Sequence, residues 1–157
     1  MEDIKKIIVV TRMTKSSRKA VHYGVSLAEK YGSELYVMHV IDRPFGTDLR
    51  GWSLPLPSLD ETYKKIVEEE QKELDKIIAL EKNKGLSIKK IIKEGKEAEE
   101  ILKTVKKENI DLLIMPSHSE SRLEHLLFGG SNDEIMRTMP CSVFLVKEEP
   151  GEGAFED

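Results

Sequence analysis

The chain has 157 residues, which fits one domain with a substantial core. Hydrophobic residues make up 39% and charged residues 34% of it, a balance typical of a globular protein rather than a disordered chain. The net charge of −4 disfavours nucleic acid and anionic membranes as partners. Cys141 is the only cysteine, which excludes an internal disulfide and a zinc site of several thiolates. The first apolar run, "KIIVV", is too short for a signal peptide or a membrane span, so we expect a cytoplasmic protein.

The first third of the sequence predicts a strand, a helix and a second strand. Lys6 to Val10 is a continuous β-branched run, which is typical of a strand buried on both faces. The polar stretch Thr11 to Ser17 follows. Apolar residues then recur at helical spacing from Ala20 to Tyr31, and Gly32 is a natural helix end. Glu34 to Ile41 is the second predicted strand.

The middle of the sequence begins with an irregular segment, Asp42 to Asp60, which contains three prolines, two glycines and the only tryptophan. Such long loops are more often functional than ordinary. The apolar spacing from Leu59 to Ile78 predicts a long amphipathic helix that ends near Gly85. The run "SIKKIIKEG", Ser87 to Gly95, is the third predicted strand.

The last third repeats the alternation of helix and strand. Ala98 to Val105 forms an apolar helical stripe, and Asp111 to Met115 is the fourth predicted strand. Ile135 to Met139 marks the last helix, and Ser142 to Val146 is the fifth strand. The acidic end, Glu148 to Asp157, is expected to be a flexible tail.

Strands that alternate with helices predict an α/β fold with a parallel sheet and helices on both faces. We find no linker or second domain, so residues 1–147 are expected to form a single domain. Ligands of such sheets bind beyond the C-terminal ends of the strands. The candidate segments are therefore Thr11 to Ser17, Asp42 to Asp60 and Pro116 to Ser131.

Six motifs in order, "KKIIVV", "ELYVMHVID", "KEGKEAEEIL", "IDLLIMPSHS", "LEHLLFGG" and "IMRTMPCSVFLV", resemble the universal stress protein (UspA-like) family over about residues 4–147. The resemblance implies a five-stranded parallel sheet sandwiched by helices, Rossmann-like and similar to the adenine nucleotide alpha hydrolase fold. It also implies a homodimer joined through the last strand, about Ser142 to Lys147. Family members divide into those that bind ATP and those that do not.

ATP-binding members resemble one another in a G-x2-G-x9-G-(S/T) loop and an aspartate after the first strand. The loop positions fall here on Pro116, Ser119, Gly129 and Gly130, so one of four matches. The aspartate position falls on Arg12, and a phosphate loop needs amides that Pro116 lacks. We therefore predict that ATP binding is lost and that there is no cofactor, with ATP or AMP as the alternative. The candidate residues of this degenerate nucleotide or anion site are Val10, Thr11, Arg12, Val40, Pro116, Ser117, Ser119, Gly129, Gly130 and Ser131.

Two interpretations of the remaining polar groups stay open. In one, the residues from Gly129 to Asn132 open the last helix and bind an anion together with Arg12. In the other, which we favour, Ser131 caps that helix and the two arginines, Arg12 and Arg122, pair with Glu120 or Glu124.

No catalytic constellation is evident. His118 lies near serines, but no acid is placed to orient it and hydrolytic motifs are absent. The histidines show no i,i+4 pair, which argues against a metal site, and His39 is expected to pack in the core. We therefore predict a non-catalytic homodimeric stress-response or signalling module. The apolar residues of the Asp42 to Asp60 loop cover the vacant pocket or contact an unknown protein partner, and the sequence leaves both open.

Overall fold

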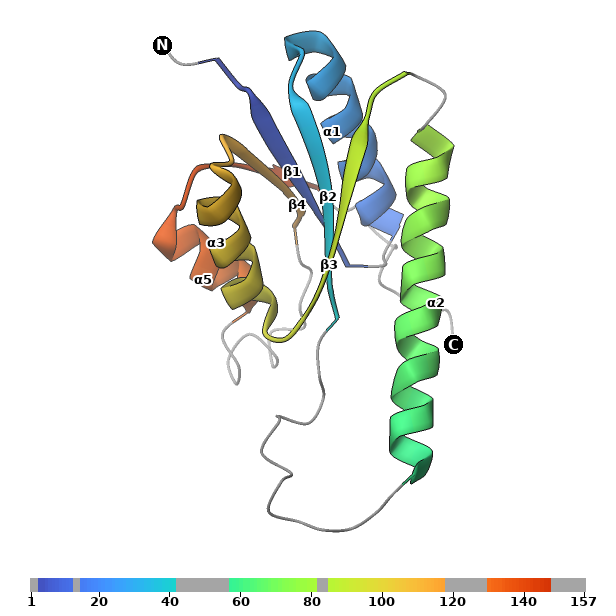
Figure 1. Cartoon of the computed structure of the whole chain (residues 1–157). Helices are drawn as coiled ribbons and strands as arrows, with labels where there is room; N and C mark the ends of the chain where they lie inside the picture. The colour runs from blue at the N-terminus through green and yellow to red at the C-terminus, as the bar shows by residue number, and fades with distance from the viewer. Residues whose placement is uncertain (1–2, 13–14, 42–56, 82–84, 118–129, 148–157) are drawn as a thin grey trace.

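The computed structural model describes residues 3–12, 15–41, 57–81, 85–117 and 130–147 (Figure 1). Strands and helices alternate along the chain, as the sequence predicts. The strands are β1 (Lys6–Thr11), β2 (Glu34–Ile41), β3 (Ile88–Glu94), β4 (Leu112–Pro116) and β5 (Ser142–Val146). The helices are α1 (Lys15–Tyr31), α2 (Pro57–Glu81), α3 (Glu97–Glu108) and α5 (Ser131–Thr138).

The strands form one parallel sheet in the order β3-β2-β1-β4-β5. This confirms the predicted five-stranded α/β fold. Because β2 and β3 are added on one side of β1 and β4 and β5 on the other, the strand order changes direction between β1 and β4. β3 and β5 are the two edges.

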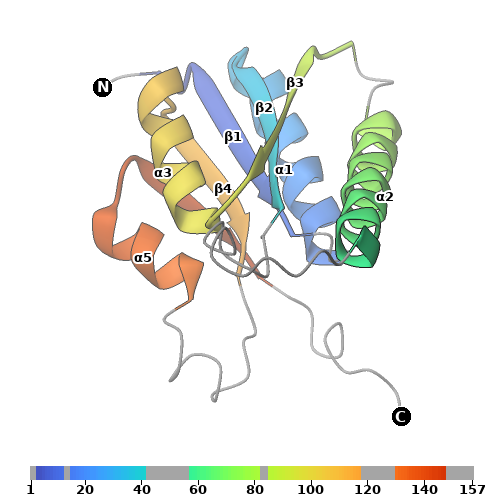
Figure 2. The same cartoon turned by 60° about the horizontal axis from the view of Figure 1, so that its bottom comes forward.

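Helices cover both faces of the sheet, with α1 and α2 on one side and α3 and α5 on the other (Figure 2). Residues of β1 alternate between the two layers: Ile7 and Val9 pack towards α1, whereas Ile8 and Val10 pack towards α3. All four are fully buried, which explains why the strand is a continuous apolar run rather than an alternating one.

Gly24 allows α1 to approach the sheet closely. A Cβ at this position would lie 2.3 Å from Val9 Cγ2 and 3.3 Å from Leu35 Cδ1. Valine is stiff and its surroundings are densely packed, so the methyl group has no space. We expect Gly24→Ala to lower the free energy of unfolding by about 1–3 kcal/mol, as overpacking does, despite alanine's better helix propensity. Urea unfolding measures this, with Ala substituted at exposed Lys30 as the control, and equal stability of the two variants would contradict the close packing.

Three element boundaries differ from the sequence prediction. α1 begins at Lys15, inside the predicted polar stretch, and α2 begins at Pro57, inside the predicted loop. Proline suits the first turn of a helix because its missing amide has no intrahelical partner there. Met139 lies just beyond α5 as its left-handed C-cap, with φ 42°. Within the described ranges, no helix is both long and apolar enough to cross a membrane.

Candidate functional site

Polar residues from four elements gather where the strands end. Arg12 directly follows β1, and Pro116 is the last residue of β4. Glu97 and Ser131 are the first residues of α3 and α5. The cluster therefore lies at the change in strand order, where open α/β sheets place their ligand sites.

The Arg12 guanidinium connects β1 to the other three elements. Its Nε donates to Glu97 Oε1 at 2.8 Å, and its Nη1 donates to the Pro116 carbonyl oxygen at 2.9 Å. Its Nη2 donates to Ser131 Oγ at 3.2 Å and also to Asn132 Oδ1. The side chain is only 10% exposed. All three guanidinium nitrogens therefore have protein acceptors.

Glu97 supplies the counter-charge. Its carboxylate accepts from Arg12 through one oxygen and from the Ser131 hydroxyl through the other. Glu97 also lies in the first turn of α3, where the helix dipole favours negative charge. The side chain is 22% exposed, so water screens the pair only partly. The Arg12 cation and the helix N-terminus would otherwise attract a phosphate. The Glu97 carboxylate already neutralises them.

The backbone at the end of β4 offers no free amide. Pro116 has no N–H, and its carbonyl oxygen accepts from Arg12 and, at 3.3 Å, from Asn132 Nδ2. The Ser117 amide donates to the Val146 carbonyl oxygen at 2.8 Å. A phosphate-binding loop requires amides that point towards the ligand. These two residues do not supply them.

The expected capping role of Ser131 is wrong. Gly130 is the N-cap of α5, with φ −57° and ψ 151°, and its carbonyl oxygen accepts from the Asp133 and Glu134 amides. Ser131 is the first helical residue, and its hydroxyl instead bridges Arg12 and Glu97. A serine hydroxyl both donates and accepts, so it can serve a cation and an anion together.

The other described candidates form the floor of the site. Val10 and Val40 are buried in the layer that faces α3. Thr11 is 1% exposed, and its hydroxyl donates to the Met38 carbonyl oxygen at 3.3 Å. His39 is 5% exposed, which confirms the expected burial.

Several predicted site residues lie outside the described residues. These are Ser119 and Gly129 of the loop, together with His118, Arg122 and the two expected acidic partners Glu120 and Glu124. The Asp42 to Asp60 loop also lies outside them, except for the backbone of residues 57–60, which begins α2.

Glu97 is the site residue that the sequence interpretation missed. The residues "EGKE" after the third strand look like a turn glycine followed by the acidic first turn of a helix. Gly95 does form that turn, with φ +141°. However, β3 is parallel to β1, so the C-terminal ends of the two strands lie at the same end of the sheet. Applying the strand-end rule to this segment would have identified Glu97.

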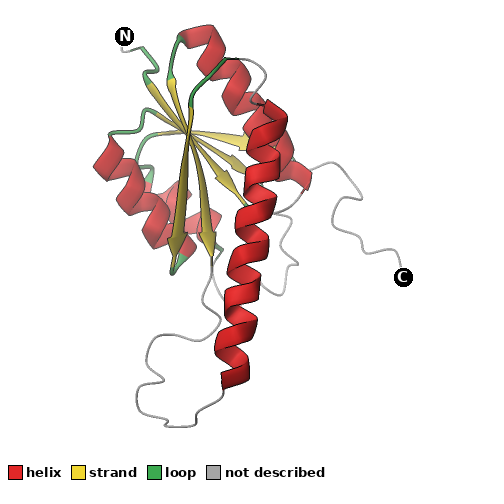
Figure 3. Cartoon of the chain, turned by 45° about the vertical axis from the view of Figure 1, so that its right-hand side comes forward, coloured by secondary structure: helices red, strands yellow, loops and turns green. Residues whose placement is uncertain are grey.

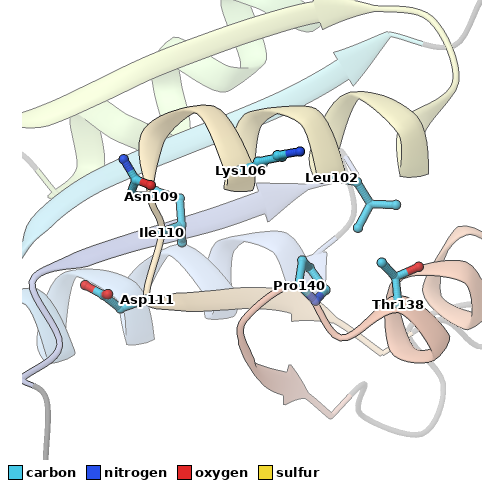
Figure 4. Close-up of a pocket in the computed structure, with 7 residues that line it drawn as sticks. All are labelled: Leu102, Lys106, Asn109, Ile110, Asp111, Thr138 and Pro140. Carbon is cyan, nitrogen blue, oxygen red and sulfur yellow. The ribbon is translucent and has the colours of Figure 1, made fainter.

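An open groove of about 510 Å³ lies at the opposite end of the sheet, where β4 begins and α3 and α5 end (Figure 4). Lys106, Asn109 and Asp111 contribute polar groups to its lining. The Asp111 carboxylate already accepts from the Lys5 and Lys6 amides, at 2.8 Å each. The groove therefore takes no part in the strand-end site.

The chemistry available to the described residues is limited. They contain no cluster of three or more histidine, cysteine or acidic residues that could hold a metal ion. Burial raises the pKa of the Cys141 thiol, so this group is not a thiolate nucleophile at neutral pH.

The architecture is a parallel α/β sheet with a cluster of polar residues at its strand ends, and comparison with known proteins specifies the family. The model of the universal stress protein family matches residues 3–147. The chain belongs to the universal stress protein family.

Individual relatives agree with this assignment. Universal stress protein MJ0531 from Methanocaldococcus jannaschii is 29% identical over 147 residues, which cover 92% of this chain and 82% of the relative. The structure of universal stress protein UspA from Lactobacillus plantarum has a TM-score of 0.71 at 16% identity, covering 93% and 99% of the two chains. The universal stress protein from Archaeoglobus fulgidus in complex with dAMP has a TM-score of 0.60 at 14% identity, covering 94% and 100%. At these identities the two structures show a shared fold.

Proposed function

We propose that this universal stress protein is a non-catalytic, homodimeric stress-response or signalling module that does not bind ATP in the family manner. The observation that carries the proposal is the Arg12–Glu97 pair, which occupies the strand-end site and neutralises it. Cytoplasmic location is part of the proposal and rests on the sequence alone.

ATP binding would require several changes at once. The triphosphate would meet the Glu97 carboxylate, and like charges at close range repel. Displacing that carboxylate would remove one of Arg12's acceptors and leave the Ser131 hydroxyl without its own. Neither Pro116 nor Ser117 offers an amide to repay this cost.

A second candidate is a module that binds a small phosphate compound such as AMP. Arg12 and the Ser131 hydroxyl both donate to the Glu97 carboxylate, so two oxygens of a phosphate could accept the same hydrogen bonds once the Glu97 side chain moved away. A structural neighbour in complex with dAMP makes a monophosphate the natural choice. A thermal-shift screen separates the two candidates, because a ligand that binds only the native state raises its stability.

The dimer is proposed to form through β5. This strand pairs with β4 on one side and is an edge of the sheet on the other. Phe144 and Leu145 are 39% and 41% exposed. An edge strand with unpaired backbone groups and apolar side chains favours pairing with another strand. A second copy related by a two-fold axis satisfies both edges at once.

Replacing the apolar β5 side chains should weaken this dimer. We expect the double substitution Phe144→Glu and Leu145→Lys to raise the dimer dissociation constant at least roughly ten-fold, because charges at an interface core must be desolvated. Leu80→Lys on α2 is the matched control, since Leu80 is 68% exposed and α2 packs against α1 and β2, and β1 and β4 separate β2 from β5 in the sheet. Sedimentation velocity measures both variants. A wild-type monomer at all concentrations, or equal weakening by the control, would contradict the β5 dimer.

Native mass spectrometry of the protein as purified tests the whole proposal. The expected species is a dimer with the mass of two unmodified chains. A retained ATP on each chain would overturn the proposal, whereas a retained monophosphate would select the second candidate.

A further inference from the structure

His39 is a buried titratable residue that the strand-end cluster does not use. It lies on β2, and its imidazole faces the helical layer of α1 and α2. Nδ1 lies 2.9 Å from the Thr11 carbonyl oxygen, and Nε2 lies 3.0 Å from Glu70 Oε2 of α2. The His39 side chain is 7% exposed and the Glu70 side chain 31%. One imidazole therefore joins β1 and β2 to α2.

The two acceptors determine how many protons this arrangement holds. A carbonyl oxygen can only accept, so Nδ1 must carry a proton. The Glu70 carboxylate is also an acceptor when ionised, so a second proton must lie between Nε2 and Oε2, on one atom or the other. Removing that proton would place the Nε2 lone pair against a carboxylate 3.0 Å away. A neutral imidazole and an ionised carboxylate together carry one proton, whereas this contact needs two. The contact therefore depends on one additional proton, bound to His39 or to Glu70.

Two cations on α1 and α2 share one carboxylate of α2. Arg18 of α1 donates to Glu73 of α2 at 3.1 Å, and Lys76 donates to the same carboxylate at 3.3 Å. Both cations therefore bind the Glu73 carboxylate. Among the described residues, the His39 imidazole lies against the Glu70 carboxylate and can compensate its charge.

Charged groups on the adjoining strands are also engaged. Glu94, at the end of β3, accepts from the Tyr63 hydroxyl of α2 at 3.0 Å. Arg12 follows Thr11, but its guanidinium binds Glu97 in the opposite helical layer. The proton between His39 and Glu70 therefore lies where β1, β2 and α2 meet.

α2 is held to the domain differently in its two halves. Leu74, Ile77 and Ile78 are buried and anchor the second half in the core. None of the side chains described from residue 61 to residue 73 is buried. This half is held by polar contacts, and Glu70 makes one of them to a buried partner, His39. Figure 3 shows the helix extending along and beyond the sheet.

We infer that His39 and Glu70 form a proton-dependent clamp that fastens the first half of α2 to the sheet. The clamp is closed while the shared proton is bound. It weakens as pH rises through the range in which histidine loses its charge, about pH 5–8 in general. It also weakens at much lower pH, when the carboxylate itself is protonated. Through the Thr11 carbonyl oxygen, it contacts the residue that precedes Arg12, but it does not depend on whether the strand-end site binds a ligand.

Hydrogen–deuterium exchange of the amides in residues 61–73 tests the clamp in the intact protein. After correction for intrinsic exchange rates, we expect these amides to exchange roughly ten-fold faster at about pH 8.5 than at about pH 6, because a charge-assisted bond is lost. Amides of residues 74–81, beside the buried anchor, should change much less. Ring-nitrogen NMR of His39 at about pH 6 should show protonation at both positions or a proton shared with Glu70.

Glu70→Gln is the decisive variant, because a glutamine amide can donate to a neutral Nε2 without any additional proton. It should keep the helix docked and abolish the pH dependence. His39→Gln removes the titrating ring and should do the same, so either variant decides if the other does not fold. Glu81→Gln is the control, since its partner His22 has a side chain that is 53% exposed. Protection of residues 61–73 that does not change with pH in the wild type, or pH dependence that survives Glu70→Gln, would overturn the inference.

Discussion

Replacing Arg12 with methionine should lower the free energy of unfolding by about 2–4 kcal/mol. Methionine keeps most of the length and the apolar stem but removes hydrogen bonds to four acceptors. Glu97, 22% exposed, would then be a largely desolvated carboxylate without its counter-charge. Removing one partner of a buried pair is costly for this reason, even where the intact pair contributes little net stability. For a chain of this size, the loss corresponds to a fall in Tm of roughly 5–15 °C.

Two variants separate this effect from simple loss of a charge. Arg12→Lys keeps the charge, but an ammonium group lacks the planar fork with which arginine binds several acceptors at once. We therefore expect an intermediate loss of unfolding free energy. Arg18→Met removes an arginine whose side chain is 59% exposed and whose ion pair lies at the surface, and should cost less than about 1 kcal/mol. Urea unfolding compares all three. Equal stability of the Arg12→Met and Arg18→Met variants would show that the strand-end pair is no more than a surface contact.

The second large effect is a gain of ATP binding. We expect it from five changes made together: Arg12→Asp, Glu97→Gln, Pro116→Gly, Ser119→Gly and Gly130→Ser. They restore the glycines and the hydroxyl of the family loop and the aspartate after the first strand. They also remove the Glu97 carboxylate, which fills the site. Each defect of the wild type costs about 1–3 kcal/mol through backbone strain or an unmade polar contact. Together they account for several orders of magnitude in the dissociation constant.

The structure makes Glu97 part of this set, although the family loop motif does not include it. Arg12→Asp alone would place a second carboxylate beside Glu97, so this variant should bind no ATP and should also be destabilised. The same four changes without Glu97→Gln should bind more weakly than all five. Calorimetry with Mg-ATP measures this series, and circular dichroism verifies that each variant is folded. A folded five-fold variant without ATP affinity would contradict this account of the site.

The sheet could be predicted from the sequence because its strands carry their own signal. The four central residues of β1, Ile7 to Val10, are buried on both faces of the sheet, so each must be apolar. Gly95 could be predicted as a turn for a similar reason, since few other residues adopt a φ of +141°. Helix boundaries were less accurate, because α1 begins in a polar segment with no apolar periodicity.

The position of the candidate site could be predicted from the sequence, but the side chains that pair within it could not. Because ligands of such sheets bind beyond the C-terminal ends of the strands, the sequence predicts Arg12, Pro116 and Ser131 at one end of the sheet, where the structure places them. The partner of Arg12 could not be found in this way, because Glu97 is 85 positions away in sequence. Its role arises only when α3 brings its first turn beside β1. Ser131 was misassigned for the same reason, since a capping serine and a bridging serine look alike in sequence.

Calorimetric titration of the wild-type protein with Mg-ATP tests the central claim most directly. With Arg12 and Glu97 paired in the site, we predict no binding with a dissociation constant below about 1 mM. A one-to-one complex per chain with a dissociation constant in the micromolar range would contradict this account. It would mean that ATP displaces the Arg12–Glu97 pair or binds beside it.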